Sequence, residues 1–282
     1  MSLNSGILWI VATPLGNPGD LSPRARETLA AVDGILAEDT RRAGLLLARC
    51  GIEPPVFTSL HDHNEAERVE TVLGWLREGK QLALVSDAGT PLLSDPGFRL
   101  VRACRKAGIA VSPVPGPAAP LAALSACGLP PQPFVFLGFP PRKESERLSF
   151  FSPYASLPAT LVFFERKDRL RSTLDAARRT LGNREGCIAR ELTKTFEEFI
   201  PFSLDALDAV PTELLGEITV VLGPPAGDFR TDDAEVDRII AAEKRQGGKP
   251  RELARRVHLR VCGWNAKELY QRILDNGSGT EV

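Results

Sequence analysis

The sequence lacks the features that mark membrane-spanning, disulfide-rich and zinc-binding proteins. No apolar run approaches the roughly 20 residues that cross a bilayer. The N-terminus lacks the basic and apolar pattern of a signal peptide, so we expect a cytoplasmic protein. The five cysteines are widely spaced without a C-x-x-C pair, which argues against a disulfide framework and against a zinc site.

Histidine is scarce, and several common catalytic motifs are missing. With only three histidines, we expect no multi-histidine metal site. His61 and His63 flank Asp62 and could ligate a metal, although such a pair at a strand end more often shapes a loop or contacts a substrate. The motifs G-x-G-x-x-G, G-x-x-x-x-G-K-[ST], H-E-x-x-H and G-x-S-x-G are absent. Dinucleotide binding, nucleoside triphosphate hydrolysis, metalloprotease and hydrolase chemistry therefore have no support.

The charge is nearly balanced overall but unevenly distributed. A net charge of −1 by itself gives no indication of nucleic-acid binding. Between residues 244 and 260 the single acid is Glu252, and the cations are Lys244, Arg245, Lys249, Arg251, Arg255, Arg256 and Arg260. Such a stretch either binds phosphates or forms the solvated face of a helix.

Short apolar runs alternate with amphipathic segments as far as residue 223. The expected strands are residues 7–13, 34–37, 56–60, 82–86, 109–114, 134–138, 160–164, 186–190 and 217–222. This alternation predicts an α/β protein with largely parallel, helix-covered sheets. A capping residue before proline predicts helix starts at Ser22 and Asp95, and apolar spacing predicts a helix over residues 65–80.

Two proline-rich segments divide the chain. The run from Pro113 to Pro117 interrupts regular structure, so we expect one α/β domain over residues 1–116 and a second over residues 117–224. Residues 223–227 predict a linker to a polar, helical region at 225–282. Its expected helices are residues 232–245, 251–260 and 265–275, the last beginning near a capping box of Asn265 and Glu268. These helices, with Gly263 in the turn, could form a small helix-turn-helix-like module.

Four polar loops follow expected strands, at the sheet edge where open α/β proteins bind ligands. They cover residues 13–17, 37–42, 61–65 and 86–91. In the last loop, small residues allow a ligand to approach the backbone, and Asp87 supplies a counter-charge for a cation such as a sulfonium. Gly89 and Pro91 could instead only form a turn, with Asp87 capping a helix. Four such loops at one edge favour a pocket.

These loops carry the motifs VATPLGNPGDLSPRA, ILAEDTRRAGLLL, LHDHNE and LVSDAGTPLLSDPG, and PVPGPAA and ARELTKTFEE follow in order. On these motifs the chain resembles the ribosomal RNA small subunit methyltransferase I family of the tetrapyrrole methylase superfamily, over about residues 7–223. The sequence RELARRVHLRVCGWNAKELYQRIL resembles the helical tail of that family. The resemblance implies two α/β domains of tetrapyrrole-methylase type with a cofactor cleft between them, and a homodimer.

The resemblance also implies an activity and a cofactor. The expected reaction is the S-adenosylmethionine-dependent 2′-O-methylation of a cytidine ribose in the decoding region of 16S ribosomal RNA, in the small ribosomal subunit. Carried over residue by residue, the cofactor contacts fall on Pro14, Asp87, Ala88, Gly89, Thr90, Ala118, Ala119, Phe164 and Leu192.

A ribose hydroxyl is a weak nucleophile, so a general base would accelerate its methylation. The candidate bases are Glu38, Asp39, His61, Asp62 and Glu191. Arg41 and Lys194 could hold a phosphate or lower the hydroxyl pKa. We favour residues 38–41 as a substrate-facing loop, but these acids could equally pair with Arg41 and Arg42 and only fix the loop.

Contacts to RNA phosphates are expected from basic residues in three parts of the chain. The candidates are Arg42, Arg142, Lys143, Arg147, Lys249, Arg251, Arg255 and Arg256. Two other functions stay open: a tetrapyrrole-ring methyltransferase with the same fold and cofactor, and a non-catalytic RNA-binding protein on a methylase scaffold. The basic tail disfavours the first, and the intact loop at Asp87 disfavours the second.

Overall fold

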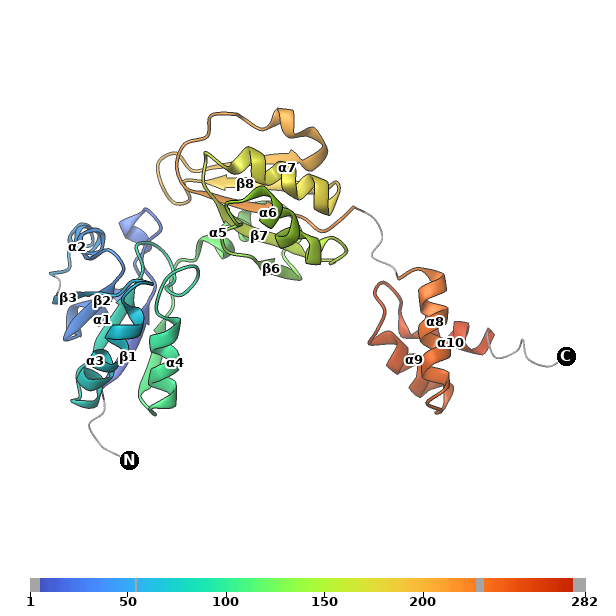
Figure 1. Cartoon of the computed structure of the whole chain (residues 1–282), viewed down its shortest axis with the longest axis horizontal. Coiled ribbons are helices and arrows are strands. Elements are labelled where there is room, and N and C mark those ends of the chain that lie inside the picture. The colour runs from blue at the N-terminus through green and yellow to red at the C-terminus, as the bar shows by residue number, and fades with distance from the viewer. Residues whose placement is uncertain (1–5, 54, 227–230, 276–282) are drawn as a thin grey trace. The chain divides into compact units, whose positions relative to one another are not determined.

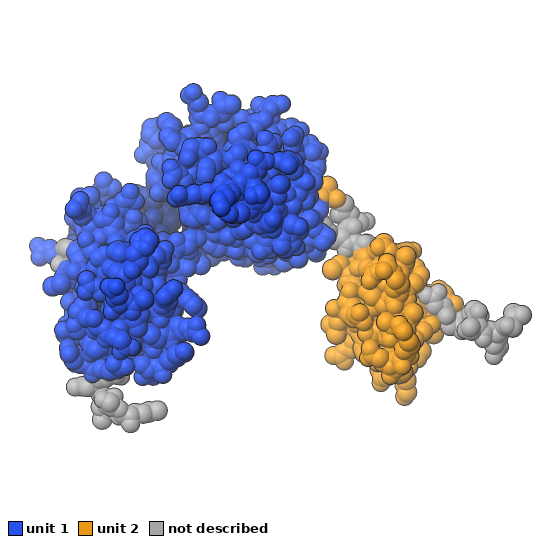
Figure 2. All heavy atoms as spheres, in the orientation of Figure 1, with its two compact units in different colours: residues 1–225 blue, residues 226–282 orange. Residues whose placement is uncertain are grey.

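The computed structural model describes residues 6–53, 55–226 and 231–275. By its internal contacts the chain divides into two compact units, Met1–Pro225 and Ala226–Val282 (Figure 2). The first unit contains two five-stranded sheets (Figure 1). Gly227 of the expected linker lies outside the described residues. Within the described ranges, no helix has the length and apolar character needed to cross a membrane.

The first sheet is parallel throughout, with the strand order β3-β2-β4-β1-β5. Its strands are β1 (Ile7–Val11), β2 (Gly34–Ala37), β3 (Val56–Ser59), β4 (Leu82–Val85) and β5 (Ala110–Val114). β2 and β4 are buried along their whole length, as parallel strands covered by helices on both faces should be. Because all five strands run the same way, the loops after β1, β2 and β4 meet at one edge.

Helices cover both faces of this sheet. They are α1 (Pro23–Ala31), α2 (Thr40–Arg49), α3 (Glu65–Arg77) and α4 (Phe98–Lys106). Leu29 of α1 and Leu47 of α2 belong to the core on one face. Leu76 of α3 and Leu100 of α4 belong to the core on the other. This burial of apolar helix stripes holds the loops at the carboxyl edge in fixed positions.

One expected helix start is confirmed and the other is wrong. Ser22 Oγ accepts a hydrogen bond of 3.1 Å from the backbone N–H of Ala25, so it caps α1 as the sequence predicts. Asp95 caps no helix. α4 begins at Phe98 after Gly97, whose φ of 122° favours glycine and separates Asp95 from the helix. Asp95 therefore lies in the irregular loop between β4 and α4.

The second sheet corrects the expectation of largely parallel strands. Its order is β6-β7-β10-β8-β9, and only the β6–β7 pair is parallel among these described strands. The strands are β6 (Phe134–Phe136), β7 (Thr160–Glu165), β8 (Glu185–Arg190), β9 (Glu198–Ser203) and β10 (Ile218–Leu222). β9 was not expected from the sequence. It is an edge strand and carries Pro201, which a central strand would not tolerate.

Helices also cover this sheet, on a core separate from the first. They are α5 (Ala119–Ala126), α6 (Glu144–Phe151) and α7 (Leu170–Leu181), with short 3-10 helices at Ser152–Tyr154 and Leu204–Ala209; a further 3-10 helix, Pro18–Asp20, lies between β1 and α1 of the first sheet. Phe151 and Leu174 pack with Phe163 of β7 in the larger core. Ala123 of α5 packs with Val221 of β10 in a second cluster. The expected domain boundary at residue 116 falls between β5 and α5 and stays a prediction.

The second unit consists of helices over its described residues. They are α8 (Asp233–Lys244), α9 (Pro250–His258) and α10 (Ala266–Asp275), close to the three expected ranges. Their shared core includes Val236, Val257 and Leu269. The expected capping box is confirmed, because Asn265 N donates to Glu268 at 3.0 Å and Glu268 N donates to the Asn265 side chain at 2.9 Å.

Candidate active site

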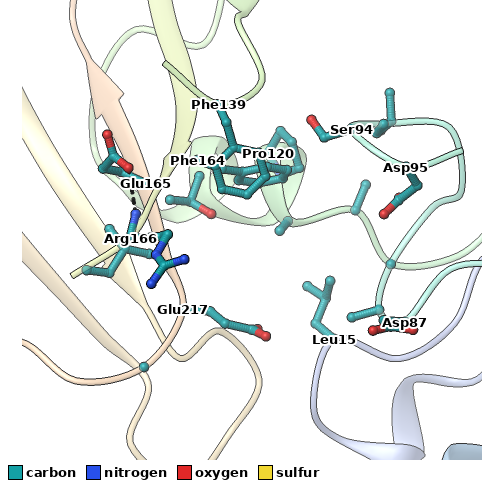
Figure 3. Close-up of a pocket in the computed structure, with 18 of the residues that line it drawn as sticks. Leu15, Asp87, Ser94, Asp95, Pro120, Phe139, Phe164, Glu165, Arg166 and Glu217 are labelled. Carbon is teal, nitrogen blue, oxygen red and sulfur yellow. Dashed lines mark hydrogen bonds between the residues drawn. The ribbon is translucent and has the colours of Figure 1, made fainter. Parts of the chain in front are cut away.

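A cavity of about 520 Å³ opens in the first unit and is lined from both of its sheets (Figure 3). This volume lies within the range of small-molecule sites. The lining residues are 87–90, 93–95, 118–120, 164–168 and 216–219, with Leu15 and Phe139. The loops after β1, β4 and β5, with the start of α5, contribute lining residues from the first sheet. The segment after β6, the strands β7 and β10 and the residues next to them contribute lining residues from the second sheet. The cavity therefore lies at the carboxyl edge of the first sheet, where the polar loops were expected to meet.

The loop after β4 is tied to the loop after β1 by backbone hydrogen bonds. Thr13 N donates to Gly89 O at 2.8 Å, and Gly89 N donates to Thr13 O at 3.0 Å. Gly89 has a φ of 81°, and a Cβ atom there would lie 3.1 Å from Leu15 Cδ2. Glycine is therefore favoured by the backbone conformation, and the close approach of Leu15 also disfavours a larger residue. This pairing presents the backbone of residues 87–90 to the cavity.

The loop that continues towards α4 also has unusual backbone geometry. Leu92 and Ser94 have φ values of 71° and 76°, which non-glycine residues rarely adopt. Such conformations cost about 1–3 kcal/mol each and persist where surrounding structure enforces them. Between and beyond these residues, Leu93 and Asp95 face the cavity. Figure 3 shows the Asp95 carboxylate on the same wall as Asp87.

On this wall, Asp87 is linked to α2 by an ion pair. Arg42 Nη1 lies 2.9 Å from Asp87 Oδ2. The other carboxylate oxygen, Oδ1, is buried without a hydrogen-bond partner among the described residues. A buried, unpartnered carboxylate oxygen is costly unless a ligand or water satisfies it. The arrangement suits a cationic ligand in the cavity.

On the opposite wall, the lining acids are paired with cations. Glu165 binds Arg169 at 2.5 Å, Asp168 binds Arg166 at 3.1 Å, and Glu217 binds Lys194 at 3.1 Å. Two charged lining residues, Asp95 on the wall of Asp87 and Lys167 on the opposite wall, have no such partner among the described residues. The side chains of Asp95 and Lys167 form no ion pair or hydrogen bond with any residue that the structure describes.

Asp95 also has the most strongly shifted carboxyl group at the site. Burial first, and then the negative charges of Glu38, Asp87 and Asp62, together raise the pKa of Asp95 to about 7. The pKa of Glu38 is raised for the same reasons: burial first, then Asp87 and Asp62, opposed by His61 and Arg42. Asp95 lines the cavity and Glu38 does not. A carboxyl group that is half ionised near neutrality is suited to proton transfer.

The structure brings together seven of the nine expected cofactor residues at the cavity. They are Asp87, Ala88, Gly89, Thr90, Ala118, Ala119 and Phe164. Pro14 and Leu192 do not line it. Leu192 is buried in a cluster with Leu15, so it supports the wall from behind. Whether these residues contact a cofactor stays a prediction.

The catalytic candidates divide by their local partners. Asp39 caps α2, accepting 2.9 Å and 3.2 Å hydrogen bonds from the N–H groups of Arg41 and Arg42. Those backbone hydrogen bonds, that from Arg42 first, lower the pKa of Asp39. For Asp39 the structure thus favours the alternative that it fixes the loop. Arg41 and Glu38 are exposed beside it.

The remaining candidates lie in two other loops. His61 and Asp62 precede α3, and within the described ranges no group of three or more histidine, cysteine or acidic residues is placed to hold a metal. Glu191 and Lys194 form a turn in which Lys194 Nζ lies 2.8 Å from Glu191 and 3.1 Å from Glu217. Lys194 is therefore engaged by two carboxylates rather than free for a phosphate.

The expected RNA contacts need one correction. Arg147 is 5% exposed and donates a 2.9 Å hydrogen bond to Arg142 O, so its guanidinium does not face solvent. The helix α6 buries this residue on its inner side, which its position in a basic cluster did not reveal. Arg142 and Lys143 are exposed.

In the second unit, the basic residues have two different environments. Lys249, Arg251 and Arg255 are exposed. Arg256 instead binds Glu243, a buried acid, at 2.9 Å. That ion pair joins α9 to α8, so Arg256 has a structural role in this unit.

Sequence reasoning missed six charged residues that line the cavity: Asp95, Glu165, Arg166, Lys167, Asp168 and Glu217. Asp95 was interpreted as a helix cap, although its loop was recognised as polar. Arg166 and Lys167 directly follow the apolar strand β7. Charged residues immediately after a strand are the signal that could have identified them, as it identified residues 37–42 after β2.

Comparisons with known proteins place the fold and the family of this chain. The family model for Tetrapyrrole (Corrin/Porphyrin) Methylases matches residues 7–208. Among solved structures, the methyltransferase CobJ is similar, with a TM-score of 0.61 and 20% identity over 81% of this chain and 97% of that chain. Uroporphyrin-III C-methyltransferase from Thermus thermophilus, complexed with S-adenosyl homocysteine, has a TM-score of 0.56. It is 19% identical over 77% of this chain and 97% of that chain. The fold is therefore that of the tetrapyrrole methylases.

Relatives of higher sequence identity indicate which family of tetrapyrrole methylases this chain belongs to. The ribosomal RNA small subunit methyltransferase I of Mesorhizobium japonicum is 44% identical over 276 residues, 95% of this chain and 91% of that protein. The protein of that name from Haemophilus influenzae is 41% identical over 273 residues, 95% of this chain and 96% of that protein. The chain belongs to the ribosomal RNA small subunit methyltransferase I family. The expected family and fold class are thereby confirmed, and with them methyl transfer as the class of reaction.

Proposed function

We propose that this protein transfers a methyl group from S-adenosylmethionine to the ribose 2′-oxygen of a cytidine in the decoding region of 16S ribosomal RNA. The substrate would be the small ribosomal subunit, and the enzyme would act as a homodimer. Similarity over nearly the whole chain to proteins named for ribosomal RNA methylation is the observation that carries this proposal. The cavity supports it, because one wall combines an unpartnered acidic oxygen with apolar surface.

The residues of the cavity fit the methyl donor. The buried Oδ1 of Asp87 lacks a partner among the described residues, and a positively charged group can supply one. Gly89 leaves backbone accessible, while Ala118 and Phe164 provide apolar contact. We therefore assign donor binding to residues 87–90, Ala118, Ala119 and Phe164. When bound, S-adenosylmethionine would supply a methyl group carried on a positively charged sulfur. After transfer of the methyl group, the rest of the donor would leave as a neutral thioether.

Within this proposal, Asp95 is the general base. Its carboxylate takes the proton of the ribose hydroxyl as the oxygen–methyl bond forms, which offsets the weak nucleophilicity of a neutral hydroxyl. Asp95 lines the cavity beside Asp87, and its pKa of about 7 leaves it partly ionised at neutral pH. Glu38 is the second candidate, because its pKa is also raised. With both molecules bound in the cavity, alignment of the acceptor oxygen with the methyl group would contribute several kcal/mol to catalysis.

The exposed cations would bind the RNA backbone. Arg42, Arg142 and Lys143 lie in the first unit, and Lys249, Arg251 and Arg255 in the second. Contacts to phosphates orient the RNA and give salt-dependent affinity, whereas they do not read sequence.

The proposal is tested by mass spectrometry of 16S ribosomal RNA from cells without this protein. We expect one cytidine of the decoding region to lose its 2′-O-methyl group, and plasmid-borne wild-type protein to restore it. The Asp95→Asn protein should be expressed to the same level and fail to restore it. An unchanged set of ribose methylations in the deletion strain would contradict the assignment.

A further inference from the structure

Two adjacent cations, Arg166 and Lys167, lie on the wall of the cavity that faces Asp87 and Asp95. They are exposed, and Figure 3 shows the Arg166 guanidinium beside the cavity, between Glu165 and Glu217. Arg166 is paired with Asp168 at 3.1 Å, whereas the Lys167 ammonium has no ion-pair partner in the described part of the chain. Lys167 is thus an unneutralised cation at the cavity.

The turn that carries these cations is held by a buried carboxylate. Glu165 Oε1 accepts hydrogen bonds from Arg166 N at 2.8 Å and Arg169 Nε at 2.9 Å. Its Oε2 accepts from Thr173 Oγ1 at 2.5 Å. The Glu165 side chain is fully buried, so this network ties the turn to α7. The backbone of the turn is therefore pre-organised, and ligand binding need not order it.

We infer that Lys167, assisted by Arg166, binds a backbone phosphate next to the ribose that is methylated. This inference rests on the proposed function and adds a phosphate site to it. A phosphate on one wall would direct the acceptor hydroxyl towards Asp95 on the other. An ammonium on a flexible stem suits a phosphate as a point charge.

The environment of Arg166 is consistent with recruitment by a phosphate. The Arg166 and Asp168 side chains are 67% and 56% exposed, so their ion pair contributes little stability. A phosphate, with more charge and more acceptor oxygens, can compete for the guanidinium. The nearby Glu165 carboxylate cannot compete for the Arg166 guanidinium, because Arg169 and Thr173 already donate hydrogen bonds to its two oxygens. Exposure on the cavity rim favours a phosphate of a large substrate over the donor's own carboxylate.

The test compares Lys167→Gln, Arg166→Gln and a control, Lys106→Gln, which removes an exposed lysine at the end of α4. Methyl transfer to unmethylated 30S particles is measured across salt concentrations, and donor affinity is measured by calorimetry. For Lys167→Gln we expect KM for the particle to rise about tenfold, as for loss of one hydrogen bond to a charged group, with kcat nearly unchanged. The salt slope should fall by about 0.7–0.9. Arg166→Gln should show a smaller effect of the same kind.

The outcomes separate this inference from the function on which it rests. A wild-type KM and salt slope in Lys167→Gln, with an active wild-type enzyme, would overturn the phosphate site alone. So would weakened donor binding with an unchanged KM for the particle, because that result would assign Lys167 to the donor carboxylate. An inactive wild-type enzyme would overturn the proposed function and this inference together. Lys106→Gln should match wild type throughout.

Discussion

Arg42 and Asp87 form an ion pair of 2.9 Å that joins the first turn of α2 to the wall of the cavity. The two residues are expected to serve different ligands, since Arg42 is exposed towards solvent and Asp87 faces the cavity. Their side chains are 71% and 28% exposed, respectively. The ion pair therefore connects a residue available to a large substrate with one that we assign to the methyl donor.

Asp87→Asn should lower the affinity for S-adenosylmethionine by about 10- to 100-fold. The substitution keeps the shape of the side chain but removes the negative charge, and hydrogen bonds to charged groups contribute about 1.5–3 kcal/mol. Isothermal titration calorimetry measures the change. Arg42→Ala is the comparison: because its ion pair is largely exposed, donor affinity should fall less than about fivefold. Equal, small effects of both substitutions would remove Asp87 from the donor site.

The methylation rate should depend on the ionisation of Asp95. Since the pKa of Asp95 is raised to about 7, the rate should increase with pH through that value as the base loses its proton. Asp95→Asn should lower the single-turnover rate by about 10²–10⁴-fold and abolish this pH dependence. Glu38→Gln tests the second candidate base: if Asp95 is the base, this variant should retain the pH dependence with a lower midpoint, because a neighbouring negative charge has been removed. Retention of the pH limb by Asp95→Asn would exclude Asp95 as the base.

The stability of the folded protein should fall with increasing pH, whereas the methylation rate should rise. The pKa of Asp95 is about 7 in the folded protein against 3.8 for an ordinary aspartate, so the folded state binds more protons between these values. Its contribution to stability is therefore favourable at low pH and is lost as pH rises towards 7. Asp95→Asn should raise the melting temperature at pH 8 by about 2–4 °C, after allowance for partial exposure. Near pH 4 the two proteins should melt alike, and scanning calorimetry at both pH values makes the comparison.

Gly89→Ala should destabilise the first unit by about 1–2 kcal/mol and weaken donor binding. Its φ of 81° disfavours alanine, and the new Cβ would approach Leu15 Cδ2 to 3.1 Å. Gly74→Ala in α3 is the matched control, since nothing lies within 4 Å of its Cβ position and alanine favours helix. Denaturant unfolding should show a loss for the first variant and a gain of about 0.5–1 kcal/mol for the second.

Charge reversal in the second unit should weaken RNA binding without altering donor binding. Arg251→Glu and Arg255→Glu change exposed residues of α9, so the three-helix core should persist. Affinity for the 30S particle should fall, with a shallower dependence on salt. Arg256→Glu should differ, because it places two acids together at Glu243 and should lower the melting temperature of the unit. Filter binding and circular dichroism distinguish these results.

The first sheet could be predicted because its central strands are continuous apolar runs. The apolar residues of its helices recur with the period of 3.6 residues that marks an amphipathic helix. β9 escaped prediction because its apolar residues follow a charged segment and include Pro201. Proline lacks a backbone N–H, so a strand tolerates it at the edge of a sheet but rarely in the centre. The strand directions in the second sheet depend on connections between β7, β8 and β10, and similar apolar runs occur in both kinds of sheet.

At the site, local sequence identified the loops but not the partners of each side chain. Asp39 looked available for catalysis, and only its hydrogen bonds to α2 show that it is a cap. The Asp95–Pro96 pair had the pattern of a helix start, yet a positive φ at Gly97 delays the helix and leaves Asp95 at the cavity. Long-range pairing, such as Lys194 with Glu217, determines which charges remain free.

The central claim is that the cavity beside Asp87 and Asp95 supports methyl transfer to an RNA ribose. The most direct measurement is transfer of an isotope-labelled methyl group to unmethylated 30S particles, followed by nuclease digestion and mass spectrometry. We predict label in a single 2′-O-methylcytidine from the decoding region, and none with the Asp95→Asn protein. Label on a base, or undiminished ribose methylation by that variant, would contradict the claim.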